Sequence, residues 1–300
     1  MPDHKISIRV SELPAEKNVD FIETSFFHEN NSRKLPTPSE VRSRATHPRT
    51  HRPDPIRFTE DNLIVKWGEY VTIAEGQVYW MLQTHLKGEI PAPEIYGWRT
   101  EGNQVFLYLE YITENQLEEV HHELGTESRS KINSQIRSIK TALLRLRQNP
   151  TQEFLGSIGG QPLPDTACED DDNLAGPPPS VAAFHCWLTD RALKRFPDPE
   201  PTKPLREMLP DNVPIVFSHC DLHPKNILVS PAEPSKIVAI VDWHQSGWYP
   251  SYWERCKAEW GNYGDWIVEN LPEVSKDDAS GDHEGLFKAF CMYCQLLSIF

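Results

Sequence analysis

The stretch VFSHCDLHPKNILVSPAEPSKIVAIVDWHQSGWYP, residues 216–250, decides the fold of this chain. An apolar run ends in His219–Asp221, and Asn226 follows after four intervening residues. A later apolar run ends at Asp242. Short apolar runs bounded by proline, serine and aspartate are typical of β-strands. We therefore predict that Asp221, Asn226 and Asp242 lie at the ends of neighbouring short strands and face one cleft.

These three side chains suit phosphoryl transfer. The reacting phosphate and its magnesium ions carry high charge, so the protein mainly positions and neutralises them. Mg²⁺ prefers hard oxygen ligands, which the Asp242 carboxylate and the Asn226 amide can supply. Asp221 is then predicted to be the catalytic base that accepts the proton of an incoming hydroxyl group. The structural alternative is that such residues only cap turns, and His219 is expected to hold the loop.

The segments HCDLHPKNILV and VDWHQSGWYP resemble the H-x-D-x-x-x-x-N and Asp-Trp motifs of the aminoglycoside phosphotransferase and choline kinase group. The resemblance extends from about residue 56 to about residue 265. It implies an α+β, bilobal protein-kinase-like fold, with a small N-lobe sheet carrying one helix and a larger, mostly helical C-lobe. It also implies ATP or GTP as the phosphate donor and Mg²⁺ as the cofactor.

Upstream residues agree with this resemblance in type and order. Lys66 ends an apolar run and resembles the family lysine that steadies the donor phosphates, and Glu75 on the next predicted helix can pair with it. Glu110 to Ile112 resembles the interlobe hinge, so Glu110 and Ile112 are predicted to meet the nucleotide base. A solvated strand-edge lysine and a first-turn helix glutamate favoured by the helix dipole are the structural alternatives.

Two features depart from the family pattern. No G-x-G-x-x-G segment precedes Lys66, so phosphate cover by a glycine-rich loop is not expected. The arginines of residues 42–52 are one conceivable replacement, with a solvated, partly mobile arm as the favoured interpretation. His244 stands where the family often has an acidic residue after Asp-Trp.

The sequence divides into three parts. Residues 1–54 form a polar, proline-studded and partly irregular N-terminal arm, residues 55–112 the nucleotide-binding N-lobe, and residues 113–300 the catalytic and acceptor-binding C-lobe. A hairpin, a helix and two further strands are expected in the N-lobe. In the C-lobe, the pattern predicts two amphipathic helices, three short strands and a helical remainder. A lone CxxC, Cys291 with Cys294, is expected to be two buried thiols on a terminal amphipathic helix.

Composition narrows the class of partner. The 300-residue chain has a formal charge of −14, which repels nucleic acid and anionic membranes, so neither is expected as a partner. No stretch is apolar enough to span a bilayer, and the N-terminus has no secretory-signal pattern. The expected compartment is cytoplasmic. The acidic balance, including Glu169 to Asp172, suits a cationic alcohol as small-molecule acceptor, although a solvated loop explains that run equally simply.

The aromatic residues after Asp242 have two explanations. They can surround a cationic acceptor through cation–π contacts, or they can build the core, which we favour. Alternative functions also remain open: a nucleotide-binding pseudokinase acting as an interaction module, a metal-dependent hydrolase, or a protein kinase. The intact set of predicted site residues opposes the pseudokinase. The lack of an A-P-E segment opposes the protein kinase.

Overall fold

The computed structural model describes residues 4–28, 33–47, 53–165, 177–196, 202–262, 271 and 283–297. The chain forms two compact units. The sheet unit holds residues 11–129 and 225–244, and the helical unit holds residues 1–10, 130–224 and 245–300. Both units combine separate stretches of sequence, whereas the division expected from the sequence is contiguous. The mixture of antiparallel sheet and helices confirms the α+β class.

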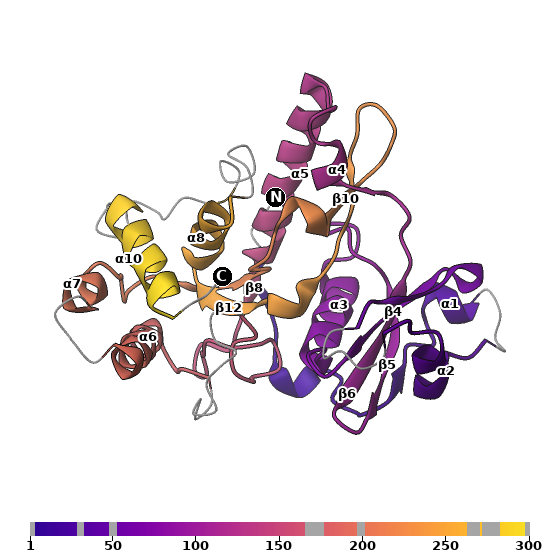
Figure 1. The fold of residues 1–300 in the computed structure, drawn as a ribbon, viewed down its shortest axis with the longest axis horizontal. Coiled ribbons are helices and arrows are strands. Elements are labelled where there is room, and N and C mark those ends of the chain that lie inside the picture. Colours follow the sequence, from indigo (N-terminus) through magenta and orange to yellow (C-terminus); the bar gives the residue numbers. More distant parts are fainter. Residues whose placement is uncertain are drawn as a thin grey trace. The chain divides into compact units, whose positions relative to one another are not determined.

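The sheet unit is built on a five-stranded antiparallel sheet with the strand order β2-β5-β6-β4-β3 (Figure 1). Its strands are β2 (Val19–Asp20), β3 (Ile56–Phe58), β4 (Leu63–Gly68), β5 (Ile95–Glu101) and β6 (Gln104–Glu110). The expected hairpin is confirmed: β3 and β4 are joined by the 3-10 turn η2 (Thr59–Asp61) and by Asn62, which is left-handed at φ 51°. Asparagine tolerates this conformation better than most residues, which is why the turn closes here.

The two faces of this sheet are covered by different helices. Side chains alternate between faces along a strand, so Leu107 and Trp98 face helix α3 (Ile73–His85), while Phe106 and Tyr108 face the opposite side. A Cβ on Gly76 of α3 would lie 2.8 Å from the Trp98 ring, which shows how closely this helix approaches the sheet. Figure 1 shows α3 on one side of the strands and α1 and α2 on the other.

The described part of the N-terminal segment packs against the sheet. Helices α1 (Ser25–His28) and α2 (Pro38–Ser43) contribute the buried Phe26 and Val41 to the core on the second face. The guanidinium of Arg42 lies 5.0 Å from the Phe106 ring centroid and pairs with Glu101. This differs from the solvated arm expected for the basic residues, because an arginine can lay its planar group on an aromatic ring while keeping its charge in water. Arg49 and Arg52 lie outside the described residues.

A second, smaller sheet completes the sheet unit and carries the motif residues. Its order is β11-β10-β7, with all pairs antiparallel. The strands are β7 (Asn115–Gln116), β10 (Ile227–Val229) and β11 (Ile237–Ile240), with helix α4 (Leu117–Val120) after β7. Short 3-10 turns flank the two longer strands: η4 (Pro224–Asn226) before β10 and η5 (Trp243–Gln245) after β11.

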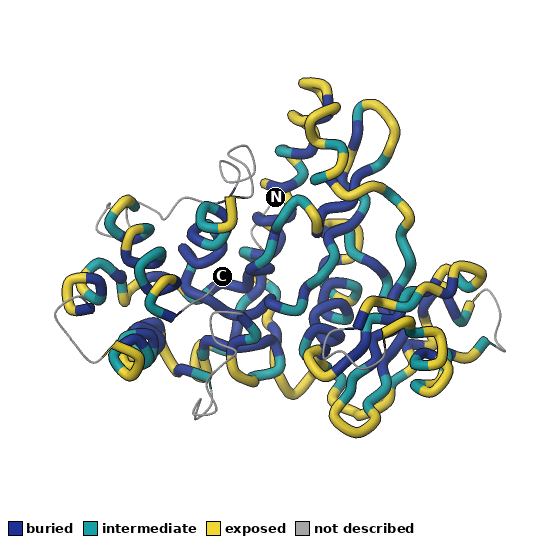
Figure 2. Tube along the Cα trace, viewed as in Figure 1, coloured by how far each residue is buried: buried dark blue, intermediate teal, exposed yellow. Residues whose placement is uncertain are grey.

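The helical unit has one large apolar core. The helices of this unit are most of α5 (Thr126–Leu143), together with α6 (Val181–Arg195), α7 (Thr202–Glu207), α8 (Trp253–Trp260) and α10 (His283–Leu296). Buried residues such as Phe184, Tyr249, Trp253 and Phe290 fill the core, and the buried stretches of these elements appear in dark blue in Figure 2. Cys291 and Cys294 are free thiols on α10, and Cys294 is buried as expected, whereas Cys291 is only partly buried.

The helical unit also has two small strand pairs. Strands β1 (Ile6–Ser7) and β8 (Leu146–Arg147) pair in parallel, and β9 (Ile215–Ser218) pairs antiparallel with β12 (Gly247–Pro250). The prediction that β9 is a neighbour of β10 and β11 is wrong, because β9 takes β12 as its partner. Cys220, left-handed at φ 62°, interrupts the extended chain between β9 and β10. Within the described residues, no helix combines the length and hydropathy needed to cross a bilayer.

Candidate active site

A partly buried ion pair connects strand β4 to helix α3. Lys66 lies near the end of β4, and its Nζ is 2.8 Å from Oε1 of Glu75 in the first turn of α3. The Thr72 hydroxyl caps that turn by accepting the backbone N–H of Glu75. The Glu75 side chain has no solvent exposure, so it depends on Lys66 for charge compensation. The sheet and the helix therefore fix the ammonium group jointly.

The same ammonium group contacts Asp242. Lys66 Nζ lies 2.5 Å from Asp242 Oδ1, which brings together three of the residues that the sequence singled out. Burial opposes the charge on Lys66, but the carboxylates of Glu75 and Asp242 outweigh it and raise the pKa of Lys66 to about 12. Lys66 is therefore cationic throughout the physiological pH range.

Asp242 is held by its backbone as well as by its side chain. It has a left-handed φ of 62°, which costs an L-residue about 1–2 kcal/mol. Its N–H donates to the Tyr79 hydroxyl at 3.1 Å, and His244 Nδ1 lies 3.0 Å from Oδ1. Burial disfavours the Asp242 carboxylate, but the His244 hydrogen bond and the Lys66 charge outweigh burial and lower its pKa well below the ordinary value.

A backbone contact brings Asn226 close to Asp242. Val241 directly precedes Asp242 in the chain, and its backbone N–H donates to the backbone carbonyl of Asn226 at 2.9 Å. The adjacent residues Ile227 and Ile240 are partners in the β10–β11 ladder. A strand pair thus brings together two residues that are separated by the β10–β11 turn in sequence. Asn226 itself is buried.

Most of the predicted site residues line one cavity in the sheet unit. Its volume is about 640 Å³, and Lys66, Glu110, Ile112, Asn226 and Asp242 all line it. Glu75 stands behind Lys66. The backbone N–H groups of Glu110 and Tyr111 donate to the carbonyls of Glu94 and Asn62. Ile112 follows these two residues, so its backbone N–H is the first in the chain after the two that donate to Glu94 and Asn62.

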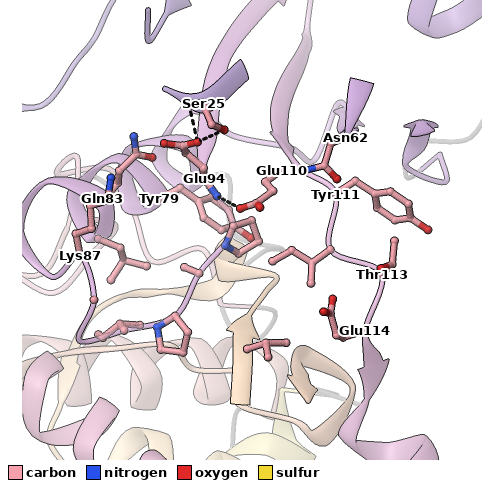
Figure 3. A pocket seen from close by; sticks show the side chains of 18 residues that line it. Ser25, Asn62, Tyr79, Gln83, Lys87, Glu94, Glu110, Tyr111, Thr113 and Glu114 are labelled. Carbon is pink, nitrogen blue, oxygen red and sulfur yellow. Dashed lines mark hydrogen bonds between the residues drawn. The ribbon is translucent and has the colours of Figure 1, made fainter. Parts of the chain in front are cut away.

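A second cavity, of about 670 Å³, lies against the same chain segment (Figure 3). Glu110 and Tyr79 line both cavities. In the second one, Glu94 Oε2 accepts the N–H and the hydroxyl of Ser25, and Glu110 Oε2 accepts the N–H of Glu94. These carboxylates therefore stiffen the segment that the sequence identified as a hinge.

Asp221, the predicted base, belongs to the helical unit. It is half-buried, and its backbone N–H donates to His219 Nδ1 at 3.1 Å. His219 is buried and accepts through Nδ1, so it holds the loop as expected. The neighbouring Cys220 is left-handed, and its N–H donates to Glu254 Oε2 at 3.0 Å. Cys220 has no exposure, and burial raises its pKa well above the ordinary value, which opposes a thiol nucleophile.

Sequence reasoning missed two residues of this arrangement. Tyr79 follows Glu75 by one helical turn, so the i, i+4 spacing could have indicated that both face Asp242. Glu254 lies on α8 and binds a backbone group, which leaves no side-chain motif to recognise. Most of the aromatic residues considered for a cation site are in the core instead: Trp243, Trp248, Tyr249, Tyr252 and Trp253 are buried. Trp260, the sixth, is partly buried and packs against the core of the helical unit. The acidic run Glu169 to Asp172 lies outside the described residues.

The donor atoms of this site fit Mg²⁺. Mg²⁺ usually takes one or two protein oxygens and completes its shell with phosphate and water. Asp242 and Asn226 offer a carboxylate and an amide at one cavity wall. Among the described residues, no group of three or more histidine, cysteine, aspartate or glutamate side chains could hold a metal alone.

The chain matches a known protein family. Residues 73–254 match the model of the Phosphotransferase enzyme family, APH. This range includes Glu75, Asp221 and Asp242 and begins shortly after Lys66. No curated protein matches the chain significantly.

Solved structures resemble the fold at low sequence identity. One is the streptomycin–ATP ternary complex of APH(2")-IIa, with a TM-score of 0.54 and 9% identity, covering 89% of this chain and 93% of that one. Another is ADP-bound aminoglycoside phosphotransferase APH(2'')-Ib, with a TM-score of 0.52 and 10% identity, covering 78% of this chain and 79% of that one. This likeness confirms the expected bilobal kinase-like fold.

Proposed function

Because the chain belongs to the phosphotransferase enzyme family, we propose that it transfers the γ-phosphoryl group of ATP or GTP to a hydroxyl group of a small molecule. One observation carries the proposal. Lys66, bound to both Glu75 and Asp242, lines one cavity with Asn226 and the segment from Glu110 to Ile112. A nucleoside triphosphate requires a cation and a metal ion for its phosphates and a binding surface for its base. The cavity offers a cation, two oxygen ligands for a metal ion and an extended backbone segment.

Each group has a role in donor binding. The Ile112 backbone meets the base, with Glu110 beside it, and Lys66 neutralises the donor phosphates while Glu75 fixes its ammonium group. Asp242 and Asn226 hold Mg²⁺, which neutralises charge on the phosphates when bound. The structures of two proteins with this fold hold ATP or ADP, which supports a nucleotide donor.

Asp221 serves the acceptor. Its carboxylate takes the proton of the acceptor hydroxyl while that oxygen forms a bond to the γ-phosphorus. The bond between this phosphorus and the β,γ-bridging oxygen breaks, and the nucleoside diphosphate leaves. His219 supports this step indirectly, because it accepts the Asp221 N–H and orients the loop.

The acceptor is proposed only as a small alcohol, including a cationic one. The net charge of −14 favours cations over anions near the surface. The buried aromatic residues after Asp242 do not add to that argument, since they pack in the core.

A nucleotide-consumption screen tests the function. The protein is incubated with Mg²⁺, ATP or GTP, and panels of amino alcohols, sugars and amines, and diphosphate release is measured. Asp221→Ala should still bind nucleotide but lose about 10²–10⁴-fold of its turnover. Asp190→Ala, which removes an exposed carboxylate from α6 of the same unit, is the matched control and should retain activity.

Other outcomes would identify other functions. Undiminished turnover in Asp221→Ala rejects the assigned base. Nucleotide binding without turnover across the whole panel favours a pseudokinase, and diphosphate release that no acceptor stimulates favours a hydrolase. A protein that binds neither nucleotide contradicts the proposal altogether.

A further inference from the structure

The imidazole of His244 and the ammonium of Lys66 meet at one oxygen atom. His244 Nδ1 lies 3.0 Å from Asp242 Oδ1, and Lys66 Nζ lies 2.5 Å from the same atom. His244 belongs to the 3-10 turn η5, directly after Asp242, and its side chain is only 20% exposed. The three side chains also line a cavity of about 250 Å³ in the sheet unit.

We propose that His244 is a positioning residue for the metal: its Nδ1–H group fixes the orientation of the Asp242 carboxylate toward Mg²⁺. The inference rests on the proposed function, because it needs Asp242 to be a metal ligand. The inference adds His244 to the residues of the proposed site, at the position where the family motif often has an acidic residue. An acid there offers oxygen acceptors, whereas an imidazole offers a hydrogen-bond donor.

The geometry explains why two donors on one oxygen matter. A carboxylate can rotate about its Cβ–Cγ bond, and rotation would move Oδ2 while leaving the backbone in place. Lys66 and His244 approach Oδ1 from β4 and from η5, so together they restrict that rotation. Oδ2 is then the oxygen assigned to the metal. Hydrogen-bonding partners of metal-binding carboxylates typically change metal affinity by about 10–100-fold when they are removed.

This role does not depend on whether His244 is charged. Carboxylate oxygens only accept hydrogen bonds, so Nδ1 must carry a proton when it contacts Oδ1. Both the Nδ1-protonated neutral tautomer and the imidazolium ion satisfy this requirement. What matters for positioning Asp242 is that a hydrogen-bond donor stands at the place of His244 Nδ1. Substitutions that keep, shift or remove this donor therefore test the proposal.

Asparagine and glutamine separate the two nitrogen positions of the ring. In His244→Asn, the side-chain amide nitrogen can occupy the place of Nδ1 and still donate to Asp242. In His244→Gln, the amide nitrogen lies near the place of Nε2, and in His244→Ala no donor remains. The three variants therefore compare a donor at the right place, a donor at the wrong place and none.

Equilibrium binding of ADP, measured by calorimetry at a series of free Mg²⁺ concentrations, provides the readout. ADP affinity without Mg²⁺ should be the same in wild type and all three variants. The Mg²⁺ concentration that gives half of the metal-dependent gain in affinity should rise by about 10–100-fold in His244→Ala and His244→Gln. It should stay close to the wild-type value in His244→Asn.

Two results would overturn the role of His244. One is a His244→Ala protein with the Mg²⁺ dependence of wild type. The other is a His244→Asn protein that is as impaired as His244→Ala, since this would mean that the ring matters through packing. A loss of ADP affinity without Mg²⁺ in the variants also points to packing. If wild type itself binds no nucleotide, the proposed function fails, and this role fails with it.

Discussion

The Lys66 ammonium nitrogen lies 2.5 Å from Oδ1 of Asp242, although 176 residues separate them in sequence. This contact places a permanent positive charge against the carboxylate proposed to bind Mg²⁺. Both residues line the same cavity, so under the proposed function a phosphate chain that enters it would meet the ammonium group and the proposed Mg²⁺ site together. Lys66 is therefore the residue whose charge the proposed reaction needs most.

Lys66→Met should lower kcat/KM by about 10²–10³-fold, because it removes a fixed cation from the phosphates that develop charge. Methionine retains much of the apolar stem, so the change is mainly in charge. Lys236→Met, at an exposed position just before β11 of the same unit, is the matched control and should leave kcat/KM unchanged. Steady-state kinetics with saturating acceptor measure both. Equal activity in the two variants would exclude Lys66 from donor binding.

Gly97→Ala should destabilise the sheet unit by about 1–3 kcal/mol through overpacking. An added Cβ would lie 2.2 Å from the Val19 carbonyl oxygen, which belongs to the edge strand β2. Gly125→Ala adds the same methyl group where nothing lies within 4 Å, so it causes no overpacking. It should destabilise the protein less than Gly97→Ala does, through a weaker N-cap of α5 alone. Urea unfolding of both variants tests this contrast. Equal midpoints would mean that β2 does not pack here in solution.

The local elements were predictable from the sequence because their signals are local. The β3–β4 hairpin has a polar turn between two apolar runs, and α3 and α6 have helical spacing of apolar residues with serine or threonine caps. Strands β2, β7 and β12 were not predicted. A strand of two to four residues is too short to show a recognisable alternation of apolar and polar residues. Such a strand forms because it pairs with a strand elsewhere in the chain.

The site was predictable only where side-chain chemistry marks it. The order of Lys66, Glu75, Asn226 and Asp242 indicated a shared site, and the structure brings these four together in the sheet unit. Tyr79 carries no such chemical mark, because it acts on a backbone N–H, and only its helical spacing from Glu75 could have indicated it. Backbone groups are alike at every position, so a residue that binds one leaves no motif in the sequence.

His185 makes the stability of the helical unit sensitive to pH. It is buried, and its two ring nitrogens contact Asp211 at 2.8 Å and Tyr252 at 2.7 Å. Burial is the main cause that lowers the pKa of His185 from 6.5 to about 4, with the Asp211 hydrogen bond opposing it. Between these two values, the unfolded chain binds a proton that the folded protein excludes, so unfolding becomes easier as pH falls.

The free energy of unfolding should therefore be highest above about pH 6.5 and fall by about 2–3 kcal/mol as pH falls to 4. His185→Gln removes the titrating ring and should flatten this part of the profile, although it also lowers the plateau. His121→Gln removes an exposed imidazole and should retain the wild-type slope. Denaturant unfolding at a series of pH values provides the measurement. An unchanged slope in His185→Gln would assign the effect to other groups.

Glu254 holds the loop that carries the proposed base. Its Oε2 accepts the N–H of Cys220, whose left-handed backbone directly precedes Asp221. Burial also lowers the pKa of Lys140 on α5, while the charge of Glu254 opposes this effect. Among the described residues, neither Lys140 Nζ nor Glu254 Oε1 has a hydrogen-bond partner. Glu254 therefore offers a hydrogen bond to the loop and a charge to Lys140, and substitutions can separate the two.

Glu254→Gln keeps an oxygen that can accept the Cys220 N–H but removes the charge, whereas Glu254→Ala removes both. A hydrogen bond to a charged group contributes about 1.5–3 kcal/mol, so Glu254→Ala should lower kcat by about 10–100-fold as Asp221 loses its position. Nucleotide affinity should not change, because the donor cavity lies in the other unit. Glu254→Gln should retain more of the kcat than Glu254→Ala does. Equal losses in the two variants would mean that the charge beside Lys140, rather than the bond to Cys220, maintains the loop.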